Sequence, residues 1–104
     1  MYFVKLRVTP RRSAREPRAH IATCFVNTRS ALVAMERART RLGSGDWDAG
    51  EVLEIRQVRR SSCMEDAAFL EQYDLAETAG IAIHLYTWTF QRPGAGVEHG
   101  RQAV

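Results

Sequence analysis

Four stretches of the chain have the residue pattern of a β-strand, and two stretches with helical spacing lie between them. In residues 2–8, Tyr2, Val4, Leu6 and Val8 alternate with Phe3, Lys5 and Arg7, which predicts a strand with one buried face. The other strand-like stretches are richer in β-branched and aromatic residues. The predicted strands are residues 2–8, 19–26, 51–59 and 81–90.

Two helices are predicted by spacing and by capping residues. In residues 29–42, apolar residues recur at spacings of four, three and four, so they share one helical face. Asn27 or Thr28 is the expected N-cap of this helix. Ser62 and Glu65 form a capping box, S-x-x-E, which predicts that the second helix begins there. Gly80 is expected to end it.

The predicted order of elements is β-β-α-β-α-β, which indicates the α+β class. The economical arrangement is a two-layer sandwich, a four-stranded sheet with two helices on one face. Residues 1–90 then form a single domain. Residues 91–104 contain one proline and three glycines and predict a C-terminal tail, flexible or borrowed by a partner.

In this arrangement the second face of the sheet is uncovered and rich in aromatic residues. We call it the aromatic face. In the last strand, the aliphatic residues Ile81, Ile83 and Leu85 point to the helices. In the third strand, Leu53 and Ile55 are expected on the helix side. The aromatic face then receives Phe3, Lys5, Arg7, Val52, Glu54, Arg56, Val58, Ala82, His84, Tyr86, Trp88 and Phe90.

Charge is unevenly distributed along the 104 residues, whose formal net charge is +3. Residues 1–18 have a net charge of +5, and residues 65–77 have a net charge of −5. A basic region and an acidic helix in one small domain favour self-association or an oriented partner over a uniform nucleic-acid coat.

Three functions are compatible with an exposed aromatic face, which proteins normally cover. The favoured one is a non-catalytic assembly or binding module, a homo-oligomer that associates through this face. The first alternative is binding of single-stranded nucleic acid by aromatic and arginine residues, although no RNP1-like motif occurs and Glu54 would repel phosphate. For all three, the candidate interface residues are Phe3, Arg7, Arg56, His84, Tyr86, Trp88 and Phe90.

The second alternative is a small cofactor-free enzyme with a pocket at a dimer interface and His84 as general base. Cys24 and Asn27 end the neighbouring strand and are its candidate neighbours. A histidine packed in an interface is the favoured interpretation, because the sequence supplies no orienting partner. No phosphate loop, nucleophile elbow or metal-ligand spacing occurs, so no metal and no cofactor are expected. Cys24 and Cys63 give neither a disulfide framework nor a zinc site.

Three segments resemble small uncharacterised bacterial α+β proteins with a ferredoxin-like layout. They are YFVKLRV, CFVNTRSALVAMERARTRL and WDAGEVLEIRQV, which together span roughly residues 1–60. The dimeric α+β barrel enzymes are a looser analogy, and neither resemblance implies an activity. No apolar run could span a membrane. The first residues, MYFVKLRV, are too short and too charged for a signal peptide, so a cytoplasmic location is expected.

Overall fold

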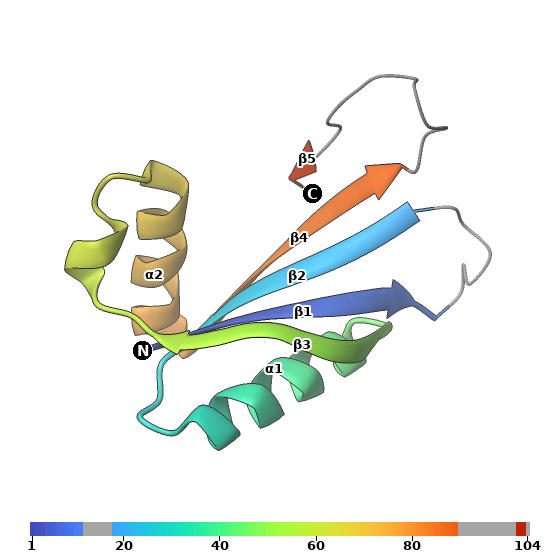
Figure 1. Ribbon diagram of the computed structural model, residues 1–104. Helices are drawn as coiled ribbons and strands as arrows, with labels where there is room; N and C mark the ends of the chain where they lie inside the picture. Colours follow the sequence, from blue (N-terminus) through green and yellow to red (C-terminus); the bar gives the residue numbers. More distant parts are fainter. Residues whose placement is uncertain (12–17, 90–101, 104) are drawn as a thin grey trace.

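The fold is an antiparallel sheet with one helix on each of its two faces (Figure 1). The computed structural model describes residues 1–11, 18–89 and 102–103. Strand order in the sheet is β3-β1-β2-β4-β5. The α+β class and the predicted element order are confirmed. The strands are β1 (Tyr2–Pro10), β2 (Arg18–Val26), β3 (Trp47–Gln57), β4 (Ile81–Thr89) and β5 (Gln102–Ala103).

The helices begin at residues other than those predicted. Helix α1 (Ala31–Ser44) starts after Ser30, whose hydroxyl accepts a hydrogen bond from the Val33 amide. A short 3-10 helix, η1 (Arg60–Cys63), contains Ser62 of the predicted capping box. Helix α2 (Ala67–Ala79) instead begins after Asp66, whose carboxylate satisfies two free amides of its first turn. Gly80 ends α2 with φ 94°, a conformation that favours glycine.

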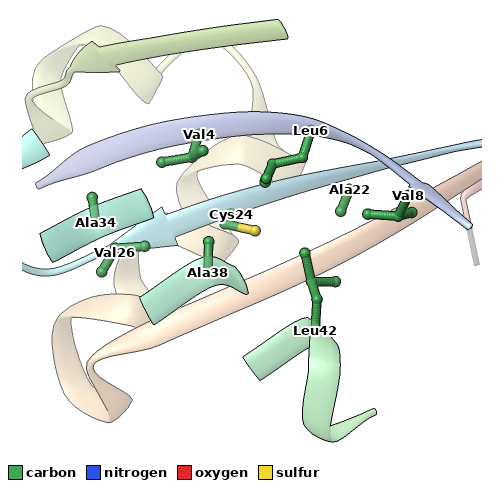
Figure 2. Packing of buried hydrophobic residues seen from close by; sticks show 9 residues of the cluster. All are labelled: Val4, Leu6, Val8, Ala22, Cys24, Val26, Ala34, Ala38 and Leu42. Carbon is green, nitrogen blue, oxygen red and sulfur yellow. The ribbon is translucent and has the colours of Figure 1, made fainter. Parts of the chain in front are cut away.

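Helix α1 packs on one face of the sheet, against alternate residues of β1 and β2 (Figure 2). Small residues at Ala34 and Ala38 let the helix approach the strands closely, and Leu42 closes the end of this core. Partly buried aliphatic residues of β4 complete it. The buried members are Val4, Leu6, Val8, Ala22, Cys24, Val26, Ala34, Ala38 and Leu42.

Helix α2 packs on the opposite face, so the expectation of two helices on one face is wrong. Its second core contains Phe3 and Phe25, which point away from the α1 core because successive side chains of a strand alternate. Ala76 lies buried among them, and Phe69, Leu70 and Tyr73 of α2 pack around it. The structure therefore has three layers where α2 lies, and two layers beyond it (Figure 1).

A bulged register in β3 overturns part of the predicted facing. Lys5 pairs with Glu54, but the next residue of β1, Leu6, pairs with Val52, so one residue of β3 is skipped. The extra residue is Leu53, which is 37% exposed, while Val52 packs with the α1 core. The prediction had these two residues reversed, since strict alternation fails across a bulge.

Two boundaries also differ from expectation. The third strand was predicted to begin at residue 51, but β3 already begins at Trp47, which packs against the edge of the α1 core. In the predicted tail, Gln102 and Ala103 pair with Thr87 and Tyr86 of β4 as a fifth strand. The other tail residues lie outside the described part of the chain, so its flexibility or exchange with a partner stays a prediction.

Candidate functional site: the open half of the aromatic face

The aromatic face is divided into a half covered by α2 and a half that α2 leaves open. Figure 1 shows α2 across one end of the sheet, with β1, β2 and β4 running on past it. Sheet register assigns the residues of each half, because cross-strand partners share a face. The covered half contains Phe3, Phe25 and Ala82, and we define the open half as Lys5, Arg7, Ile21, Thr23, His84 and Tyr86.

The covered half is a cluster of aromatic rings. Phe25 packs edge-to-face against Phe3 and Phe69, with ring centroids 5.4 and 5.3 Å apart, and contacts Tyr73 at 6.3 Å. Such geometry stabilises beyond the area that it buries. Phe3, a predicted interface residue, is therefore a core residue of α2 packing.

The open half combines partly exposed apolar surface with cations. Ile21 lies between Arg7 on β1 and Tyr86 on β4. His84 and Tyr86 are half-buried, and their rings lie 4.7 Å apart. The predicted neighbours His84 and Tyr86 are thus brought together, and Lys5 and Arg7 lie on the same half.

Charged residues along β3 partly neutralise this surface. The Arg56 guanidinium donates to the Glu54 carboxylate at 2.7 Å and lies 5.1 Å from the centre of the Phe3 ring. Arg7 lies 4.0 Å from the carboxylate of Glu51. These pairs are solvent-exposed, so each stabilises the fold by at most about 1 kcal/mol.

A groove of about 320 Å³ lies where α2 overhangs the sheet. Its walls come from β1, β2, β3 and β4 and from the first residues of α2. The sheet supplies Lys5, Thr23, Arg56 and Tyr86, and the helix supplies Asp66 and Phe69. This groove joins the two halves of the aromatic face.

Of the predicted interface residues, five can be placed. Arg56 lies over Phe3, His84 lies beside Tyr86, and Arg7 lies further along β1 with Glu51. The side chain of Trp88 and the whole of Phe90 lie outside the described residues.

Sequence reasoning missed Ile21, Thr23 and Phe25 of β2 and Asp66 and Phe69 at the start of α2. The β2 residues could have been found from the alternation of 20–26, because both of its sets are largely apolar.

His84 has no acid-base partner on the described residues. Its ring contacts Tyr86, and its backbone carbonyl accepts a weak hydrogen bond from the Thr23 hydroxyl at 3.5 Å. Cys24 belongs to the core on the other face of the sheet, and the Asn27 side chain donates to the Glu77 carbonyl at 3.5 Å. The expected neighbourhood of His84, Cys24 and Asn27 is therefore wrong.

Both cysteines are free thiols buried in different cores. Burial raises the pKa of Cys24 to about 12. Cys63 lies in the α2 core, where its thiol contacts the Arg59 carbonyl, and burial raises its pKa as well. Cys63 is thus a buried residue of the α2 core, and neither cysteine has the character of a nucleophile.

Other kinds of site are not found within the described ranges. No three His, Cys, Asp or Glu side chains there lie close enough together to hold a metal ion. No described helix has the length and apolarity needed to cross a membrane. A second groove, of about 440 Å³, lies between α1 and the turn between α2 and β4.

Comparison with protein-family models, with curated proteins and with solved structures gives no match. The resemblance to small bacterial α+β proteins therefore stays a prediction.

Proposed function

We propose that the protein is a non-catalytic assembly module that forms a homodimer through the open half of its aromatic face. The observation behind this proposal is that α2 covers only one end of that face, while Ile21, His84 and Tyr86 lie beyond it, partly buried. Apolar and aromatic surface next to a packed core is typical of protein interfaces.

Charge supports a second copy of this chain as the occupant. The sheet side contributes Lys5 and Arg7, and α2 contributes the most acidic segment of the sequence, residues 65–77 with a net charge of −5. A two-fold axis places the same surface of both copies in contact, so each basic strand can face the acidic helix of the other copy. The pairing is self-complementary without any other partner.

The cytoplasm is the proposed location. Cys24 and Cys63 are both free and lie in separate cores, which suits a reducing compartment.

Each of the two alternative functions predicts a different experimental result. Binding of single-stranded nucleic acid predicts a monomer whose Tyr86 and His84 are wet, with affinity that falls steeply with salt. An interfacial enzyme predicts turnover that is lost in His84→Ala. Glu51 and Glu54 beside the cations weaken the first, and the lack of a described acid-base partner for His84 weakens the second.

The experiment is light scattering of the wild type, Ile21→Glu and Leu32→Glu over a range of concentrations. Ile21 is in the middle of the open half, whereas Leu32 is 69% exposed on α1, the helix of the opposite face. Both variants replace an aliphatic residue by the same charge. We expect a dimer for the wild type and for Leu32→Glu, and a dimer affinity lowered by about tenfold or more for Ile21→Glu.

A wild type that is monomeric at all concentrations would overturn the proposal, as would equal dimerisation of the two variants. Titration with single-stranded RNA and DNA at two salt concentrations then distinguishes the nucleic-acid alternative.

A further inference from the structure

Lys5 is a cation without a described counter-ion, at the floor of the groove beneath α2. It lies between Thr23 and Glu54 in the register of the sheet and is half-buried. Glu54 is held instead by Arg56, at 2.7 Å. Within residues 1–11, 18–89 and 102–103, no ion pair or side-chain hydrogen bond engages the Lys5 ammonium group. The two cations of the groove therefore differ: Arg56 is paired with Glu54, and Lys5 has no described ion pair.

The carboxylates that line the groove are both engaged. Asp66 accepts hydrogen bonds from the Ala68 and Phe69 amides at 3.0 and 3.1 Å, as the cap of α2. Glu54 accepts from Arg56. The Glu54 charge is therefore balanced by Arg56, and the Asp66 carboxylate faces the amides at the N-terminus of α2, so Lys5 is the charged group of this lining without a described partner.

The walls around Lys5 include three aromatic rings beside their polar and charged groups. Phe69 overhangs from α2, Phe3 lies below it with a ring centroid 5.4 Å away, and Tyr86 lines the groove from β4. A volume of about 320 Å³ is at the lower end of small-molecule sites, which combine apolar walls with a few placed polar groups. The Thr23 hydroxyl is such a group, since it makes only a 3.5 Å contact with the His84 carbonyl.

We propose that this groove binds a small aromatic monoanion, with its carboxylate on Lys5 and its ring between Phe69 and Tyr86. The charge of Lys5 selects an anion, the single uncommitted cation selects one negative charge, and the ring-lined walls select an aromatic body. All of these groups belong to one chain, so the site is complete in a monomer, and a second copy seated on the open half would compete with the ligand for Lys5.

The test is an NMR titration with two probes of the same shape, naphthoate and its neutral amide, naphthamide. The proteins are the wild type, Lys5→Met, Lys5→Arg and the control Arg37→Met, whose cation is on α1. We expect naphthoate to shift resonances of Lys5, Thr23 and Phe69 in the wild type. Lys5→Met should lower the affinity for naphthoate by about tenfold or more, which is the effect of losing one charge-assisted hydrogen bond. The affinity for naphthamide should not change. Lys5→Arg and Arg37→Met should both retain naphthoate binding.

Three results would overturn the proposal: equal affinity for naphthoate and naphthamide, naphthoate binding unaffected by Lys5→Met, or no binding at this groove. A circular dichroism melt of each variant shows whether it is folded, and Lys5→Arg tests the charge if Lys5→Met unfolds. Parallel light scattering separates this outcome from that of the dimer, because a monomer that binds naphthoate rejects only the proposed function.

Discussion

Phe3 and Val4 are neighbours in β1, yet they belong to two separate hydrophobic cores. Val4 is fully buried against α1, and Phe3 is buried against α2 on the other side of the sheet. Beyond Phe3, the alternate residues Lys5 and Arg7 emerge from under α2 and form part of the open half. The face of β1 that meets α1 is therefore all core. Its other face contributes first to the α2 core and then to the open half.

This division predicts that each helix can be loosened separately. Phe25→Ala removes a ring that is 1% exposed and contacts three aromatic neighbours, so we expect a loss of about 3–5 kcal/mol in the free energy of unfolding. Leu42→Ala should cost about 2–5 kcal/mol through the α1 core. Hydrogen exchange is the measurement, with faster exchange confined mainly to α2 in the first variant and to α1 in the second.

Each variant is the control for the other. If both variants accelerate the amides of α1 and α2 equally, the two cores unfold as one unit and the division has no energetic meaning.

The composition of β2 explains why the two-sided packing could have been predicted. Ile21 and Phe25 are as apolar as Ala22 and Cys24, so neither face of β2 is polar over residues 21–26, apart from the Thr23 hydroxyl. A strand that is apolar on both sides is typical of a sheet covered on both sides. The simple alternation of residues 2–8 and the aliphatic side of β4 were enough for the class and order of the fold, but they do not say on which side a later helix packs.

The bulge in β3 could not be predicted from alternation, because a bulge has no residue pattern of its own here. Residues 51–55 read Glu-Val-Leu-Glu-Ile, and either Val52 or Leu53 can share a face with the core. The choice is made by pairing with β1, a long-range contact. Part of the candidate site could not be predicted for the same reason. Asp66 and Phe69 line the groove only because α2 packs on the aromatic face.

Substitution at the bulge tests this register directly. Val52→Asp places a charge against the α1 core, so we expect a loss of about 2 kcal/mol or more in unfolding free energy. Leu53→Asp changes an exposed side chain and should cost less than about 1 kcal/mol. Urea unfolding of both variants measures the difference, and a larger cost for Leu53→Asp would restore the alternation predicted from the sequence.

The start of α2 differs between the sequence pattern, which places the cap at Ser62, and the structure, which places it at Asp66. Asp66 caps the first amides of α2, so Asp66→Ala should lower the unfolding free energy by about 1 kcal/mol. Ser62 is exposed in η1 and is not the cap, so Ser62→Ala should have little effect. Thermal melts of the two variants decide between these positions, and a greater effect at Ser62 would return the helix start to the capping box.

Cys24 should make stability depend on alkaline pH. Folding raises the pKa of its thiol from an ordinary value of 9.0 to about 12, so the folded state favours the protonated form. Its contribution is fully present below the unfolded pKa and is lost as the pH rises from about 9 toward 12. By about pH 10 the wild type should have lost about 1 kcal/mol through this group. Urea unfolding of wild type and Cys24→Ala at about pH 7 and pH 10 isolates the effect, because the other titrating groups are shared.

The expected result is a stability difference between wild type and Cys24→Ala that shrinks at the higher pH. A thiol reagent offers an independent check, since burial keeps Cys24 protonated and inaccessible until the chain unfolds. Rapid labelling of the native protein at Cys24, or a difference that is the same at both pH values, would mean that the thiol ionises as freely in the folded chain as in the unfolded one. The α1 core would then be open to water at its centre, which is incompatible with the close approach of Ala38 to β2.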